Sequence, residues 1–264
     1  SAAFSSAGFN QSTSGTGTTQ IGGLLTSTAA VTLDAATVDL NAGITTTAGA
    51  AAGLVTLNAS SLVDLAGVNI TTEASQAAND TTISGAVDIN VSGTGTVNLV
   101  GNIVTTGDVN TGGTGAAGGA VTIDTNNGVM TISDITTSGG ASTNTNSNGG
   151  VAGAITITTG TNNIITLDNS TLTALGGARA GSGTQGAGAT INFDDPVALT
   201  TGTATITTGA TAGNITFDQT LNGAQALPTT LPSRGVPAAC RAPAPSPGGS
   251  AQCFLLRPAC FLEL

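Results

Sequence analysis

The chain has 264 residues and a formal net charge of −10, with 7% charged and 2% aromatic residues and no His, Trp or Tyr. The body up to residue 223 carries 13 acidic residues and one Arg, hence −12, so it has no basic surface that would attract nucleic acid or an anionic membrane. Most general-base, nucleophile-activation and phosphate-binding schemes also lack their residues, and we expect neither enzymatic activity nor a cofactor.

The chain begins with a Ser, Thr and Gly-rich lead-in over residues 1–20, which we expect to form at most a partial coil. It shows neither an initiator Met nor the pattern of a signal peptide, and no segment approaches the roughly 20 apolar residues of a membrane-spanning helix. We therefore expect a piece of a longer polypeptide, or a processed product, that does not insert into membranes.

Residues 21–223 contain seven copies of an apolar residue, a small polar residue and a second apolar residue, at intervals of 24 to 36 residues. The copies are Val31-Thr32-Leu33, Val55-Thr56-Leu57, Val87-Asp88-Ile89, Val121-Thr122-Ile123, Ile155-Thr156-Ile157, Ile191-Asn192-Phe193 and Ile215-Thr216-Phe217. A recurrence at intervals of this length is the signature of a supersecondary unit stacked on copies of itself.

Each repeat is predicted to contain three short strands. In the fourth copy, Val121-Thr122-Ile123 alternates in, out, in; a turn-rich break follows at 124–128; Met130-Thr131-Ile132 alternates again; and Ile135 begins a third apolar segment. Antiparallel hairpins would need tight Asn-Gly or Asp-Gly turns, whereas most of these breaks are longer and variable. Parallel stacking explains all seven registers with one rule and gives a rod of roughly 34 Å.

The stacked copies predict two outward columns. The central residues are Thr in five of seven copies, which suits an exposed sheet face. The position after each triplet carries Asp34, Asn58, Asn90, Asp124, Thr158, Asp194 and Asp218. We interpret these as turn residues at a corner, with a stacked Asn/Asp ladder as the alternative.

Extra length in the longer repeats falls after the third strand, at 110–119, 138–153 and 176–188, in segments of Gly, Ala, Ser, Thr and Asn. These insertions either form a contact surface on one edge of the rod or are merely tolerated there. Residues 224–264 hold seven of the eight Pro, all three Cys and three of the four Arg. This tail is predicted to be a linker, a disordered segment or an out-of-frame extension.

The sequence offers few candidates for a catalytic or metal-binding site. Asp194-Asp195 is the one adjacent carboxylate pair of the body, but neighbouring strand residues face opposite ways, which favours a solvated strand end over a catalytic pair. Asp124-x-Asn126-x-Gly128 resembles the opening of a calcium loop without its closing Glu, and Gly112-Gly113-Thr114-Gly115 lacks the Asp of a calcium β-roll.

Asp194 and Asp218 in adjacent copies would repel each other unless a cation or water intervenes. The pattern therefore allows incidental Ca²⁺ binding, and no metal ligand is assigned. An ice-binding lattice is disfavoured because the outward pair is Thr-x-Thr only at Thr156 and Thr158.

The segments Gly85–Val91, Val97–Gly107, Gly119–Asp124 and 154–160 resemble the shafts of filamentous-haemagglutinin-like adhesins and related giant bacterial surface proteins with β-strand repeats. The resemblance covers about residues 20–223. It implies a right-handed parallel β-helix, export to the bacterial cell surface, and a role in attachment or in a surface layer, and it transfers no functional residues.

The predicted fold is thus all-β, a right-handed parallel β-helix of about seven coils. The predicted function is that of a non-catalytic, stiff structural or adhesive segment of an exported bacterial surface protein, which would meet host or surface glycans and proteins through its parent. The alternative is a carbohydrate-active β-helix that binds or cleaves polysaccharide, although the body lacks the Trp and Tyr platforms typical of sugar sites.

Overall fold

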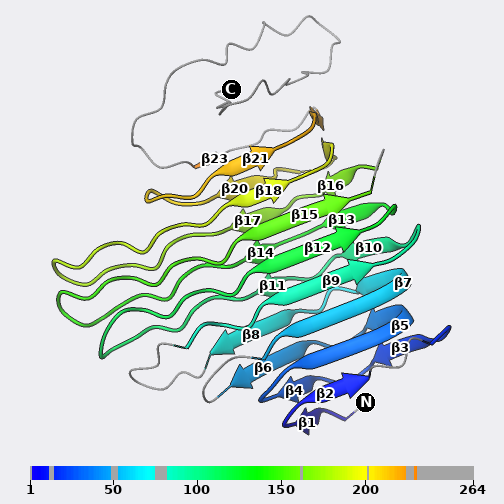
Figure 1. Cartoon of the computed structure of the whole chain (residues 1–264), viewed down its shortest axis with the longest axis horizontal. Coiled ribbons are helices and arrows are strands. Elements are labelled where there is room, and N and C mark those ends of the chain that lie inside the picture. The colour runs from blue at the N-terminus through cyan, green and yellow to red at the C-terminus, as the bar shows by residue number, and fades with distance from the viewer. Residues whose placement is uncertain are drawn as a thin grey trace, which may run out of the picture.

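The computed structural model describes residues 2–11, 15–48, 53–74, 82–160, 163–200, 202–223 and 229–230. These residues form 23 β-strands and no α-helix (Figure 1). All pairings between the described strands are parallel. The predicted all-β, parallel solenoid-like architecture is therefore confirmed.

The strands stack in three rows, numbered by their order in each repeat. Row one contains β2 (Phe9–Gln11), β5 (Val31–Leu40), β7 (Val55–Leu65), β9 (Val87–Val91), β12 (Val121–Thr125), β15 (Ile155–Thr159), β18 (Ile191–Phe193) and β21 (Ile215–Phe217). Row two contains β3 (Thr18–Ile21), the second halves of β5 and β7, β10 (Thr96–Leu99), β13 (Met130–Ile132), β16 (Ile165–Leu167), β19 (Val197–Leu199) and β22 (Leu221–Gly223).

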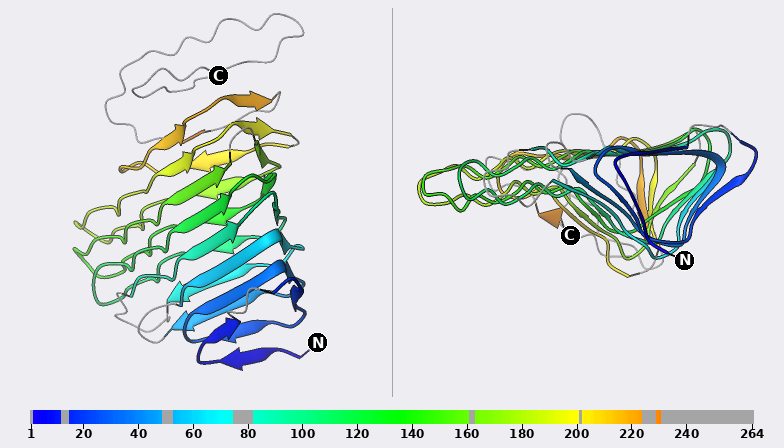
Figure 2. Two further views of the ribbon diagram at one scale, coloured as in Figure 1. Left: turned by 45° about the vertical axis from the view of Figure 1, so that its right-hand side comes forward. Right: turned by 90° about the horizontal axis from the view of Figure 1, so that it is seen from below.

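Row three forms a separate sheet. It contains β1 (Phe4–Ser6), β4 (Leu25–Ser27), β6 (Ile44–Ala48), β8 (Ile70–Ala74), β11 (Ile103–Val104), β14 (Ile135–Thr136), β17 (Thr171–Thr173), β20 (Thr205–Thr207) and β23 (Thr229–Thr230). Seen from below, the three rows enclose a triangular body (Figure 2).

The seven predicted triplets lie in row one and pair in the predicted register. Val31 pairs with Val55, and the same rule runs through every following copy to Ile215. In the first six copies both apolar residues are buried and the central residue is partly exposed. Strand β2 adds Phe9-Asn10-Gln11 below Val31-Thr32-Leu33, a further copy whose third residue is polar and therefore breaks the sequence pattern.

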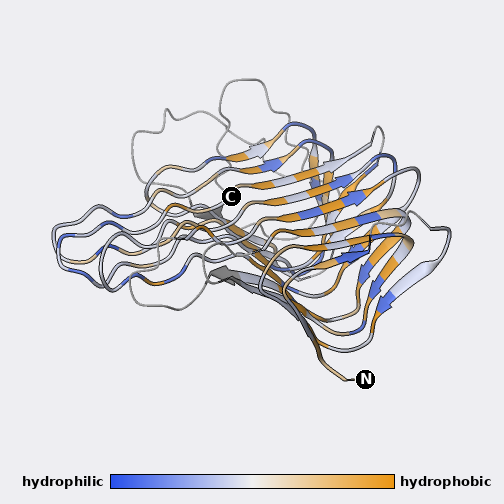
Figure 3. Ribbon diagram, turned by 60° about the horizontal axis from the view of Figure 1, so that its bottom comes forward, coloured by the Kyte–Doolittle hydropathy of each residue, from blue (hydrophilic) through white to orange (hydrophobic). Residues whose placement is uncertain are grey.

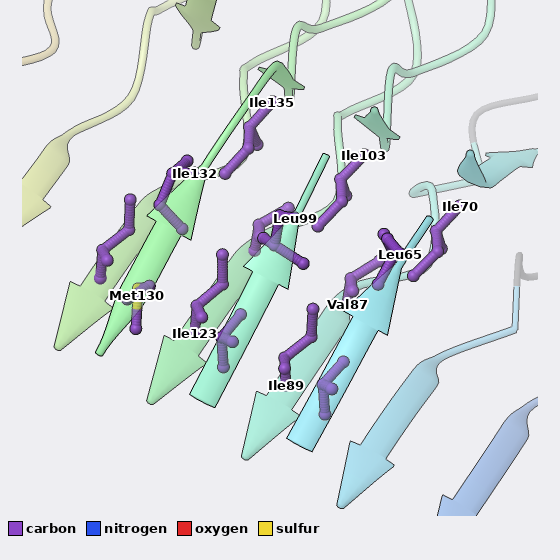
Figure 4. Close-up of a cluster of buried hydrophobic side chains, with 14 of the residues drawn as sticks. Leu65, Ile70, Val87, Ile89, Leu99, Ile103, Ile123, Met130, Ile132 and Ile135 are labelled. Carbon is purple, nitrogen blue, oxygen red and sulfur yellow. The ribbon is translucent and has the colours of Figure 1, made fainter. Parts of the chain in front are cut away.

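The apolar residues form continuous columns through the body (Figures 3 and 4). Ile123, for example, pairs with Ile89 below it and Ile157 above it, and all three are fully buried. Fully burying one such side chain stabilises a fold by about 1.5–3 kcal/mol relative to leaving it exposed. Near the C-terminal end, the rings of Phe193 and Phe217 stack with their centroids 4.8 Å apart.

The row-one strands are longer than predicted. The residue after each of the first five triplets was interpreted as a corner turn, but Asp34, Asn58, Asn90, Asp124 and Thr158 all lie within strands. The turn interpretation is wrong here because alternation continues for one more buried residue, which is Ala35, Ala59, Val91, Thr125 or Thr159. In β5 and β7 the strand even continues into row two, with a register irregularity between Ala35 and Thr37.

The long insertions stack on one another rather than forming separate loops. They extend from one corner of the triangular body as a thin, two-layered projection (Figure 2). We call this projection the wing and define it as residues 105–119, 137–153 and 174–189. In each repeat an outgoing arm leaves row three and a return arm leads back to row one.

Backbone hydrogen bonds hold the wing together in two directions. Between repeats, Gly107 N–H donates to the Ser138 carbonyl at 2.8 Å, and Gly139 N–H donates to the Leu175 carbonyl at 2.8 Å. Between the layers, the Gly150 N–H donates to the Gly140 carbonyl and the Gly177 N–H to the Gly150 carbonyl, each at 2.8 Å. The insertions are therefore hydrogen-bonded parts of the fold.

Glycine is required where the two layers meet. A Cβ on Gly139 would lie 2.1 Å from the Gly150 carbonyl oxygen, and one on Gly115 would lie 2.0 Å from that of Gly140. Neither neighbour is a side-chain atom that could rotate away, because both are backbone oxygens. The layers consequently pack backbone against backbone, which only residues without a side chain allow.

A buried hydroxyl closes the base of most loops between row three and row one. Thr105 and Thr137 donate to the Gly119 and Gly153 carbonyls at 2.5 and 2.6 Å, and each of these glycines precedes a row-one strand by two residues. We call this contact the clasp. Its members are Thr46–Gly53, Thr72–Gly85, Thr105–Gly119, Thr137–Gly153 and Thr208–Gly213.

The predicted tail, residues 224–264, lies outside the described residues except for Thr229–Thr230, which pair with β20. The predicted lead-in, residues 1–20, contains β1, β2 and all of β3 except Ile21.

Candidate functional site

The two carboxylates of Asp194-Asp195 do not form a shared site. One Asp194 carboxylate oxygen accepts a hydrogen bond from Thr158 Oγ1 at 2.8 Å, and the other accepts one from the Asn192 amide. Asp195 instead accepts from the Thr159 backbone N–H at 2.6 Å. Both residues thus fasten the end of β18 to β15 one repeat earlier, which favours the structural interpretation of this pair.

The residues of the segment that resembles a calcium-binding loop make hydrogen bonds within the fold. Asp124 is exposed on the outer face of β12, while the N–H of Asn126 donates to the Val91 carbonyl at 2.9 Å. Asn126 and Gly128 form the turn that follows the strand, and Thr125 Oγ1 donates to the Gly128 carbonyl at 3.2 Å. Within the described residues no group of three or more His, Cys, Asp or Glu side chains is arranged to hold a metal ion.

The segment Gly112–Gly115 forms the tip of the first wing repeat around a buried amide. Asn110 Oδ1 accepts from the N–H groups of Gly112 and Gly113 at 2.8 and 3.0 Å, and its Nδ2 donates to the Thr114 carbonyl at 2.7 Å. Asn110 is 1% exposed. Its amide therefore replaces the backbone partners that a sharp bend removes.

Outward polar columns run along two rows. In row one, Asn90 Nδ2 donates to Asn58 Oδ1 at 3.1 Å, so part of the Asn/Asp column is a stacked ladder. In row two, Asn98 Nδ2 donates to Asp64 Oδ1 at 2.9 Å, and Gln20 Nε2 donates to Asp39 Oδ2 at 2.7 Å. The sequence analysis did not predict the polar column of row two. Its signal is present in the sequence as the repeated triplets Val38-Asp39-Leu40, Val63-Asp64-Leu65 and Val97-Asn98-Leu99.

A concave feature with a charged side chain lies at the C-terminal edge of the wing. There a cavity of about 630 Å³ is lined by Leu175, Gly176, Arg179, Ser182, Gly183, Thr184, Gln185, Gly209, Ala210 and Thr211. We call it the notch. Six of its ten lining residues belong to the predicted insertion 176–188, among them Arg179, the single basic residue in the first 223.

Arg179 is held across the outer part of the notch. Its Nη1 donates to the Gly183 carbonyl at 2.9 Å, while the side chain stays exposed. Gln185 Nε2 donates to the Gly176 carbonyl at 2.8 Å and so joins the two arms below the notch. The notch is therefore a braced surface that presents a guanidinium group.

The chain matches no protein-family model, no curated protein and no solved structure. Among the described residues, no helix has both the length and the apolar character needed to cross a lipid bilayer.

Proposed function

We propose that this chain is a non-catalytic, stiff spacer segment of an exported bacterial surface protein, exposed outside the cell in association with the outer membrane. In this proposal the strands wind as a right-handed β-helix with one coil for each of the seven triplets. The right-handed sense is the one that parallel crossover connections almost always adopt. Host or surface glycans and proteins would be contacted through the longer parent polypeptide.

The observation that carries the proposal is the unbroken pairing of row one. From β2 to β21, each strand hydrogen-bonds to the equivalent strand of the next repeat, so the backbone forms one continuous ladder along the body. The buried columns behind the ladder and the clasp at its edge reinforce the same direction. Such a structure transmits force from repeat to repeat, which is what a spacer must do.

Single-molecule pulling on the full chain, attached at its two ends, tests the spacer. Coils should be released one or a few at a time, with each coil adding about 80–120 Å of contour length, from 24 to 36 residues at roughly 3.4 Å each. Extension without force steps would contradict a stiff stack. A parallel incubation with a panel of polysaccharides should release no reducing ends, and measurable turnover would instead favour the carbohydrate-active alternative.

A further inference from the structure

The notch exists because the wing ends abruptly between two repeats. The outgoing arm of the last wing repeat runs on to Arg179, but in the next repeat the chain turns back between Thr208 and Gly213. Three residues with positive φ make this short turn: Gly209 at 83°, Ala212 at 56° and Gly213 at 97°. The outer part of the arms, near Arg179 and Gln185, is consequently left without a covering layer.

The uncovered edge presents backbone donors. In the repeat below, the N–H groups of Gly139, Ser142 and Gly149 donate to carbonyls of the last wing repeat at 2.8, 2.9 and 3.0 Å. The residues in register with these three are Gly176, Arg179 and Gln185. Their N–H groups point toward the missing layer and find no acceptor within the described structure.

The charge at the notch is positive and locally uncompensated. Arg179 donates one guanidinium N–H to the Gly183 carbonyl. A guanidinium group has five N–H donors, so the others can bind a ligand. None of the ten lining residues is acidic. Cationic and backbone N–H donors without acceptors form the type of site that binds a carboxylate, which Arg can grip with two parallel hydrogen bonds.

We infer that the notch binds the carboxylate of an acidic sugar. Ser182, Thr184, Gln185 and Thr211 also line the notch, and their side-chain oxygens can accept hydrogen bonds from the hydroxyls of a sugar ring. A volume of about 630 Å³ accommodates one or two rings. This site goes beyond the proposed spacer function and does not depend on it, since a spacer without a ligand would keep the same fold.

Binding of galacturonate, N-acetylneuraminate and galactose to the full chain can be compared by ligand-observed NMR and calorimetry. Both acidic sugars should bind, and galactose should bind at least about 10-fold more weakly, because the charged hydrogen bonds are lost. Arg179→Gln should weaken acidic-sugar binding by a similar factor. Thr166→Asp makes the same change in net charge on row two, away from the notch, and should leave binding unchanged.

Ala210→Asp provides a second variant that leaves Arg179 in place. Ala210 is an exposed residue of the notch wall, so the new carboxylate should compete with the ligand and reduce binding without loss of β-structure in circular dichroism. Equal binding of galactose and galacturonate, unchanged binding by Arg179→Gln, or no binding at millimolar concentration would overturn the site. Acetate or a tripeptide binding as tightly as the acidic sugars would overturn the assignment to sugars.

Discussion

The threonine and the glycine of each clasp are joined by hydrogen bonds. Its threonine hydroxyl is buried and donates to a glycine carbonyl, while the glycine N–H bonds back to the threonine carbonyl, at 2.8 Å for both Thr105–Gly119 and Thr137–Gly153. At one repeat both members differ: Ala174 replaces the threonine and Ala189 the glycine, and only the backbone bond of 3.1 Å remains. The hydroxyl can also be present without the glycine, since buried Ser27 Oγ donates to the Ala29 carbonyl at 2.8 Å.

Replacing a clasp hydroxyl should destabilise the chain more than replacing a surface hydroxyl. Thr137→Val keeps the shape of the side chain but removes the donor to Gly153, and an unsatisfied buried acceptor costs about 1–3 kcal/mol. The control is Thr136→Val on the outer face of β14, which should change the free energy of unfolding by less than about 0.5 kcal/mol. Urea unfolding followed by circular dichroism measures both, and equal midpoints would argue against the clasp.

At the scale of elements, the wing depends on the spacing of its glycines. Two of every three residues face the interior or the neighbouring arm and the third faces solvent: Gly139 and Gly140 are buried beside partly exposed Ala141, and Gly149 and Gly150 beside exposed Val151. Three residues per turn is the period of polyproline-II-type chains, not of a β-strand. The arms are consequently a second kind of extended structure attached to the sheets.

Gly150→Ala should open the wing and leave the body folded. The added methyl would meet the Ala116 carbonyl at 1.9 Å, and overpacking of this kind costs about 1–3 kcal/mol or more. Hydrogen exchange should then quicken at the amides of Gly140, Gly150 and Gly177, while those of β12 and β15 keep their protection. Val151→Ala at the neighbouring exposed position serves as the control, and equal exchange in the two variants would contradict close backbone packing.

The sequence predicted the sheets better than the wing. Val121 and Ile155 pair as expected because a two-residue alternation fixes which side of a strand is buried, and with it the register. Residues such as Gly139 and Gly140 carry no hydrophobicity to alternate, so the segment resembled an ordinary loop. Its three-residue spacing was the available signal. The notch could not be found from sequence, because it depends on the relative lengths of two neighbouring insertions.

At the scale of the whole molecule, stability should vary along the stack. Strands in the middle have a neighbour on both sides, whereas β21 ends row one of the described strands. Its apolar residues Ile215 and Phe217 are only partly buried, in contrast to Ile123 and Ile157. Repeat proteins behave as nearly one-dimensional systems in which each unit is stabilised by its neighbours.

Amide hydrogen exchange of the full chain should reveal this gradient. Protection should be highest in β9, β12 and β15 and lowest in β21, because opening an end strand exposes less buried surface and breaks one ladder instead of two. Uniform protection along row one would mean that the stack opens only as a whole. The comparison needs no mutation, since strands of similar sequence at different positions serve as one another's controls.

The two periodicities of the backbone let the molecule grow independently in two dimensions. An added coil lengthens the body by one strand spacing, about 4.8 Å. Three extra residues in an outgoing arm and three in its return arm would widen the wing by one turn and move no residue of the apolar columns. Variants that differ by multiples of three residues per arm should therefore share one apolar core. A family of such chains could differ in the width of the wing while the core of the body stays the same.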